Sequence, residues 1–154
     1  MKHNILLALL LTAFLGSGCS VSKRLAPYTA ELQRAAASTM PPEEKLEVLA
    51  VTTTRALRES LTFVNPKKTG QFVDAFAKQN DRAIGSILSE LEGSISSMNA
   101  VEKVGFFART ARQPYINELK TEVKKIERKT GRKIKTFRFL SRLFGFLNPL
   151  GSGG

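Results

Sequence analysis

The chain has almost none of the side chains on which hydrolytic, redox and zinc chemistry depend. Its 154 residues include one histidine, one cysteine and no tryptophan. The histidine is His3 and the cysteine is Cys19, so both lie near the N-terminus. The rest of the chain cannot form a Ser-His-Asp or Cys-His arrangement, a zinc site of histidine and cysteine, or a disulfide. We therefore expect no catalytic residue, no metal ligand and no cofactor.

Carboxylates and glycines are also missing from the patterns that carry other chemistry. Asp74 and Asp81 are the only aspartates, and no oxygen-rich loop accompanies them as a calcium site requires. No glycine-rich loop of the phosphate-binding type occurs. Glu90 and Glu92 lie on different sides of a helix, so they cannot converge on one substrate. These absences argue against an enzyme.

Sustained alternation of apolar and polar residues, which marks β-strands, does not occur either. From Val21 onward, apolar residues recur at spacings of three and four, which is the pattern of amphipathic helices. With 42% hydrophobic residues, the 154-residue chain can bury one core but is too short for several domains. The sequence predicts an all-α protein.

The one long apolar run stands at the N-terminus. Lys2 precedes it, and it extends from Ile5 to Leu15. A permanent transmembrane helix needs about 20 apolar residues, so this run is too short to be one and fits a signal peptide instead. The alternatives are an ordinary signal peptide cut near Ser17 and an anchor that is not cleaved.

The segment Leu15-Gly16-Ser17-Gly18-Cys19 follows this run and resembles the lipobox of bacterial lipoproteins. In that family the cysteine is diacylated and becomes the N-terminus after cleavage, and its acyl chains are a durable membrane anchor. The resemblance implies a signal peptide over residues 1–18 and lipidation of Cys19. An aspartate after the cysteine retains Gram-negative lipoproteins at the inner membrane. Ser20 therefore implies sorting to the outer membrane, with the protein facing the periplasm.

Helix-breaking and helix-capping residues divide the remaining chain into helical segments. They stand at residues 41–42, 65–66, 97–99, 131 and 148–149. Asn65 is expected to cap the third helix before Pro66. Asn99 and Glu102 form a capping-box-like pair for the fourth helix. Pro114 is expected either to kink the fourth helix or to restart it.

The third and fourth helices are each about 30 residues, or about 45 Å, long. Their equal lengths and the short polar turn between them predict an antiparallel hairpin, whose open face the first two helices would cover. The expected architecture is an up-down bundle of three or four helices over residues 19–131. The fourth helix would bury a near-heptad seam made of Val101, Val104, Ala108, Ala111, Tyr115, Leu119, Val123 and Ile126.

Positive charge is concentrated in the last third of the chain. Residues 20–102 hold ten Lys or Arg and ten Asp or Glu, whereas residues 103–154 hold thirteen against three, a net charge of +10. A solvated helix face would contain interspersed acids, but none follows Glu127. This pattern favours an anionic partner. The candidate residues for the anionic-surface contact are Lys124, Lys125, Arg128, Lys129, Arg132, Lys133, Lys135, Arg138 and Arg142.

Residues 132–148 are expected to form a basic amphipathic helix, followed by a flexible Gly-rich tail over residues 149–154. Apolar residues occupy nearly half of the helical wheel, and basic or small residues occupy the rest. Such a helix is typical of a membrane interface, and the alternative is a helix that packs into the bundle core. The residues expected to face a membrane or a partner are Phe137, Phe139, Leu140, Leu143, Phe144, Phe146 and Leu147.

These features favour a non-enzymatic lipoprotein of the cell envelope, anchored through Cys19. Its basic C-terminal helix would bind an anionic membrane or envelope surface, such as phospholipid, lipopolysaccharide or a cell-wall polymer. The alternative is a scaffold or interaction subunit of an envelope complex, with this helix buried against an acidic partner protein or the bundle core. Phenylalanines among basic residues can also stack on nucleic acid, but export to the envelope disfavours that partner.

Cys19→Ala is expected to abolish lipid labelling and to release the protein from the membrane fraction, because the chain has no other thiol to acylate. Metabolic labelling with a radioactive fatty acid, followed by fractionation, measures both effects. Ser22→Ala, which keeps the thiol, serves as the control. A mature protein whose N-terminus is a free amino acid near Ser17 or Val21 would contradict the lipoprotein interpretation.

Overall fold

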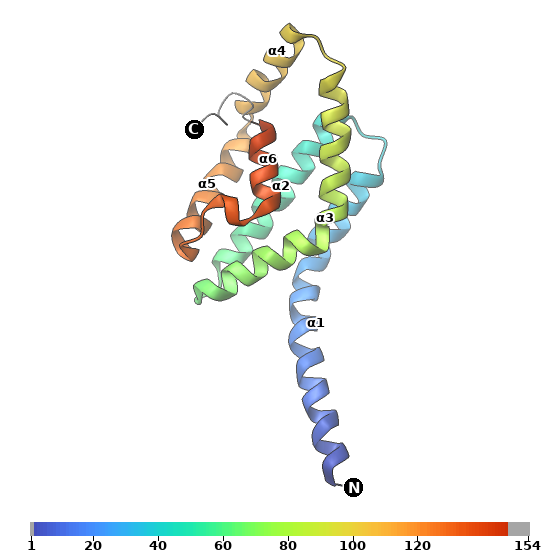
Figure 1. The fold of residues 1–154 in the computed structure, drawn as a ribbon, viewed down its shortest axis with the longest axis vertical. Coiled ribbons are helices and arrows are strands. Elements are labelled where there is room, and N and C mark those ends of the chain that lie inside the picture. The colour runs from blue at the N-terminus through green and yellow to red at the C-terminus, as the bar shows by residue number, and fades with distance from the viewer. Residues whose placement is uncertain (1, 148–154) are drawn as a thin grey trace.

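A computed structural model describes the backbone of residues 2–147 and the side chains of residues 20–147. The elements, in chain order, are α1 (Lys2–Ala37), α2 (Pro42–Leu61), α3 (Pro66–Ser96), α4 (Ala100–Ala111), α5 (Pro114–Thr130), the 3₁₀ helix η1 (Ile134–Thr136) and α6 (Arg138–Leu147). No strand occurs within residues 2–147, so the prediction of an all-α fold is confirmed (Figure 1). The tail expected over residues 149–154 lies outside the described residues.

The helix ends form where the capping residues predict them. The Asn65 side chain accepts a hydrogen bond of 2.9 Å from the backbone N–H of Lys67 at the start of α3. Asn99 and Glu102 form a complete capping box, in which each side chain accepts from the other residue's backbone N–H. Gly131 ends α5 with a φ of 68°, in the left-handed region that favours glycine. Local sequence alone therefore sets these boundaries.

The segment between Asn99 and Gly131 is two helices rather than one. α4 ends at Ala111, and α5 begins at Pro114 after Gln113, whose φ of −64° and ψ of 135° are extended. Proline cannot donate a backbone hydrogen bond, and it pushes the preceding residue out of the helical region. Of the two expectations for Pro114, the restarted helix is the one that forms.

The break gives the two halves of the predicted seam different surroundings. In α5, Leu119, Val123 and Ile126 of the seam are buried as expected, and Tyr115 is partly buried. In α4 the prediction is wrong, because Val101 and Val104 are 82% and 69% exposed and Phe106 faces the core instead. α4 has few contacts with α3, so the two long segments do not pair along their whole length.

α2 is the central helix of the bundle and packs against α1, α3 and α5. Its Leu49 and Leu57 are fully buried between these neighbours. Phe76 of α3 is also fully buried, and its ring meets that of Tyr28 from α1 edge-on, with centroids 6.4 Å apart. One contiguous apolar core thus joins helices from the whole of the chain between Leu25 and Leu147.

α6 packs on the bundle, against α3 and α4. The Phe139 ring lies 5.7 Å from that of Phe76 in α3, and the Phe146 ring lies 6.0 Å from that of Phe107 in α4. Phe144 and Phe146 are partly buried against the same core. The remaining members of the predicted apolar face are buried, namely Phe137, Phe139, Leu140, Leu143 and Leu147.

This packing corrects the expectation that the apolar face of the last helix is free for a membrane or a partner. The side chains that fill it also cover Phe76 and Phe107, which would otherwise lose apolar contacts. Each Phe or Leu buried in this way contributes about 1.5 to 3 kcal/mol. The helix is also shorter than expected, because residues 134–136 form η1 and α6 begins only at Arg138.

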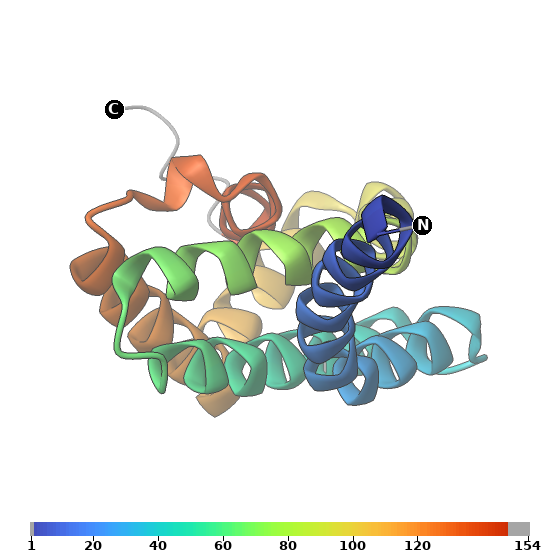
Figure 2. The same ribbon diagram turned by 90° about the horizontal axis from the view of Figure 1, so that it is seen from below.

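α1 is continuous across the boundary expected between residues 18 and 19, and it extends beyond the bundle (Figure 1). The view from below looks nearly along α1, with its N-terminal end nearest to the viewer (Figure 2). Leu25 is the first fully buried residue among the described side chains. Cys19 lies in α1, but its side chain is outside those described. Within residues 20–147, whose side chains the structure describes, no helix combines the length and the hydropathy needed to cross a bilayer.

Leu143→Ala is expected to lower the free energy of unfolding by about 2 to 5 kcal/mol, because Leu143 is 0% exposed and its loss leaves a cavity between α6 and the bundle. Val101→Ala on the exposed face of α4 is the matched control, with an expected change within about 0.5 kcal/mol. Urea denaturation followed by circular dichroism measures both. Equal effects of the two substitutions would show that α6 is not part of the core.

Candidate functional site

The nine basic residues predicted for an anionic-surface contact divide into two groups in the structure. Four of them have partners in the bundle: Lys125 pairs with Glu122 of its own helix, and the other three, Lys129, Arg132 and Arg142, bind other elements. The other five are exposed, and within residues 20–147 they have neither an ion pair nor a side-chain hydrogen bond; they are Lys124, Arg128, Lys133, Lys135 and Arg138. We call these five residues the free cations.

Arg132 joins the segment after α5 to the start of α3. Its guanidinium donates to both carboxylate oxygens of Asp74, at 3.0 and 3.2 Å. It also stacks over the Phe137 ring, 4.4 Å from the centroid. A Cβ at Gly70 would come within 3.0 Å of the guanidinium, so the absence of a side chain there lets Arg132 lie close against α3. Arg132 is therefore a structural cation rather than a free one.

Lys129 joins the end of α5 to the end of α2. Its ammonium donates to the backbone carbonyl of Leu61 at 2.7 Å and to that of Phe63 in the α2–α3 turn. The last carbonyls of a helix have no partner within the helix and carry its negative dipole end. A cation placed there satisfies these carbonyls and fixes the turn against α5.

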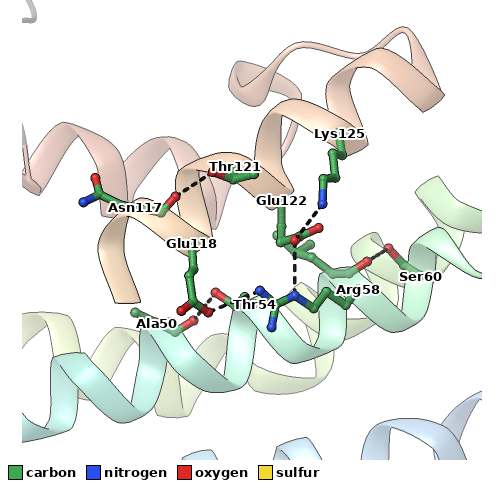
Figure 3. Close-up of polar contacts among 10 residues, drawn as sticks. Ala50, Thr54, Arg58, Ser60, Asn117, Glu118, Thr121, Glu122 and Lys125 are labelled. Atoms are coloured by element: carbon green, nitrogen blue, oxygen red, sulfur yellow. Dashed lines mark hydrogen bonds and ion pairs between the residues drawn. The ribbon is translucent and has the colours of Figure 1, made fainter. Parts of the chain in front are cut away.

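Glu122 of α5 anchors a second polar contact with α2 (Figure 3). Its side chain is only 4% exposed, and one carboxylate oxygen accepts from Arg58 at 3.1 Å and from Lys125 at 3.0 Å. Arg58 also pairs with the exposed Glu118 at 3.2 Å. Burial raises the pKa of Glu122, but the hydrogen bonds and charges of Lys125 and Arg58 outweigh it, so the pKa lies below its ordinary value.

Arg142 is held less tightly, by Glu92 of α3 at 3.6 Å, with about half of each side chain exposed. An exposed pair of this kind contributes about 0 to 1 kcal/mol. It nevertheless aligns α6 with the second half of α3. Arg142 is thus partly neutralised, in contrast with the free cations nearby in sequence.

The structure brings further cations to this region from a distant part of the chain. Lys67 and Lys68, in the first turn of α3, are exposed and have no ion pair within the described residues. An open hollow of about 340 Å³ lies between this turn and the end of α5, with Lys67 and Asp74 on one side and Thr130 and Arg132 on the other. We call the region formed by the α2–α3 turn, the first turns of α3, the last two turns of α5, η1 and the first residue of α6 the basic end.

The α2–α3 turn also presents an apolar residue that the sequence patterns did not single out. Val64 is 96% exposed, more than any other large hydrophobic residue among the described side chains. α2 ends at Leu61, so Val64 lies in the turn that follows. The sequence sign that Val64 lies in a turn is its place directly before Asn65 and Pro66, which begin the next helix.

The basic end offers charge and shape but no reactive group. Within the described residues, no cluster of three or more His, Cys, Asp or Glu side chains could hold a metal ion. The hollow next to Arg132 is open and is crossed by the Arg132–Asp74 pair. What this arrangement can do is attract and bind an extended anionic surface.

Glu122→Gln is expected to lower the free energy of unfolding at pH 7 by about 1 to 3 kcal/mol, because hydrogen bonds to a charged group are lost or weakened. The pKa of Glu122 is lower in the folded chain than its unfolded value of about 4.5, so its stabilising effect is full above pH 4.5 and disappears as the pH falls through the folded pKa. The difference between the two proteins should therefore shrink in acid. Glu118→Gln, at the exposed partner of Arg58, is the control and should change little at any pH. Chemical denaturation between pH 3 and 7 measures this, and a constant difference would contradict it.

Comparison with known proteins assigns the chain to no family. No protein-family model, no curated protein and no solved structure matches it. The function proposed below therefore rests on the residues of this chain.

Proposed function

We propose that the chain is a non-enzymatic lipoprotein of the cell envelope, whose basic end holds the bundle against an anionic surface. Acyl chains on Cys19 anchor it, in the outer membrane and on the periplasmic side. The anionic surface is a lipid headgroup layer, which includes phospholipid and lipopolysaccharide, or a cell-wall polymer. The helical bundle is the scaffold that positions the cations.

The free cations are the observation that carries this proposal. Lys124 and Arg128 lie one helical turn apart on the exposed side of α5. Lys133, Lys135 and Arg138 follow within the ten residues after Arg128. No acid after Glu127 compensates them. Like charges at this density repel each other, and a surface of opposite charge relieves the repulsion. Each cation near an anionic membrane contributes about 1 kcal/mol.

The role of the last helix changes in this proposal. α6 supports the cations from within the bundle, because its apolar face covers α3 and α4. Arg138 at its first residue is exposed, whereas Leu140 and Leu143 are not. Contact with the anionic surface thus relies on charge more than on insertion of this helix.

A second candidate function is an interaction subunit of an envelope complex, and the exposed face of α4 favours it. Val101 and Val104 are adjacent on this face and are both more than two-thirds exposed. Paired exposed apolar residues of this kind occur at protein interfaces. Ionic strength separates the two candidates, because headgroup attraction weakens steeply with salt and an apolar protein contact does not.

The test is a charge reversal in the chain that starts at Ser20, which lacks acyl chains and keeps the whole described core. Lys124→Glu with Arg128→Glu is expected to weaken binding to vesicles that contain phosphatidylglycerol by at least about 2 kcal/mol, or roughly thirtyfold, at low ionic strength. Sedimentation with vesicles measures the partitioning, and circular dichroism checks that the helices remain.

Lys103→Glu with Arg112→Glu, on α4 and at its end, is the matched control. It changes the net charge of the chain equally but at residues outside the basic end. A larger effect of the control pair would move the contact to α4. Binding that is absent, or that is unchanged by salt, would contradict the proposed function.

A further inference from the structure

The inference drawn from the structure rests on the proposed function and concerns the side of the bundle that faces the bilayer. Three independent features meet at the basic end: the point where α1 leaves the bundle, the most exposed apolar side chain, and the cations of two separate chain segments.

The first feature is the contact between α1 and the α2–α3 turn. The Arg24 guanidinium of α1 stacks over the Phe63 ring, 5.0 Å from the centroid, and pairs with Glu59 at the end of α2 at 3.8 Å. Leu25, the first buried residue, lies six positions after Cys19 in the helix, a rise of about 9 Å. Acyl chains on Cys19 would therefore hold this side of the bundle close to the bilayer.

The second feature is Val64, which lies next to Phe63 in this turn and is 96% exposed. Proline at position 66 and the cap of α3 by Asn65 fix the backbone on its C-terminal side. A single exposed apolar residue on a short turn that is held at both ends can enter the headgroup layer without unfolding the bundle. The position of Val64 therefore suits a bilayer better than the groove of another protein.

The third feature is the sign of the charge around this turn. Lys67 and Lys68 follow it directly, and Lys129 ties it to the end of α5, next to Arg128. The acids of this region are already engaged. Asp74 is paired with Arg132, Glu59 accepts from Tyr28 at 2.5 Å and pairs with Arg24, and Glu127 accepts from the Ile134 N–H.

We infer that the basic end is the membrane-docking face of the chain, with Val64 at the headgroup boundary and Lys67, Lys68 and Arg128 beside lipid phosphates. α4 and the α3–α4 turn then point away from the bilayer, since they lie at the opposite end of the bundle (Figure 1). In the view from below, the first half of α3 and the end of α5 form the side toward which α1 projects (Figure 2). The occupant of this face is an anionic lipid surface.

The experiment compares two exposed valines in the full, acylated chain. Val64→Cys and Val101→Cys each receive an environment-sensitive fluorophore and are added to vesicles of phosphatidylethanolamine and phosphatidylglycerol. The fluorophore at residue 64 should show blue-shifted emission and should be quenched by lipids that carry a quencher near the headgroup. The fluorophore at residue 101 should emit as in water. The blue shift at residue 64 should be lost on vesicles of phosphatidylcholine alone.

Water-like emission at residue 64 on anionic vesicles, or equal quenching at residue 101, would overturn the inference. A shift of the same size on phosphatidylcholine would also overturn it, because the cations would then play no part. A shift that depends on protein concentration and not on vesicles would identify a contact between copies instead.

Measurements on the unsubstituted chain distinguish a failure of the proposed function from a failure of this inference. Its one thiol, that of Cys19, takes up no fluorophore if it is acylated. Labelling of Cys19, together with failure of the chain to sediment with vesicles, overturns the lipid anchor. Water-like emission at residue 64 in a chain that does sediment overturns the docking face alone.

Discussion

The contact of Lys129 with the carbonyls of Leu61 and Phe63 fixes the geometry of the basic end. It places the last turn of α5 on the α2–α3 turn, and from there Arg132 can reach Asp74 on the next helix. Arg132 pairs with Asp74, and Glu127, the other acid nearby, accepts from the Ile134 N–H. Neighbouring basic residues such as Arg128 and Lys133 then have only solvent or an external anion to face. The surface charge of this region is thus a direct result of how its structural cations are satisfied.

The bundle itself depends on a different kind of interaction, the closure of its open side by α6. Phe139 and Phe146 meet aromatic rings from two separate helices, so a short C-terminal helix joins α3 to α4. α4 has few other neighbours, since its contacts with α3 are sparse. Without α6, apolar residues of both helices would face water. The amphipathic character of this helix therefore serves the core, and the cations at its edge remain available.

The helix boundaries could be predicted from sequence because local chemistry decides them. Asn65, the Asn99–Glu102 pair and Gly131 act within a few residues of their own position. The fate of the last helix could not be predicted in this way, because the same wheel of Phe and Leu suits a membrane interface and a core groove equally well. The groove is built from Phe76 and Phe107, which are distant in sequence. The division of the basic residues into structural and free cations could not be predicted for the same reason, because Asp74 lies 58 residues from Arg132 in the sequence.

If an anionic surface binds the free cations as proposed, it is linked to the folding of this region. The segment that follows α5 is held by Phe137, which is buried, and by Ile134, which is partly buried, and the mutual repulsion of Lys133, Lys135 and Arg138 acts against these contacts. A polyanion that neutralises them binds the folded arrangement better than an expanded one and therefore adds to its stability. The chain would then be at its most compact when it is seated on its target, so that adsorption and the last step of folding are one equilibrium.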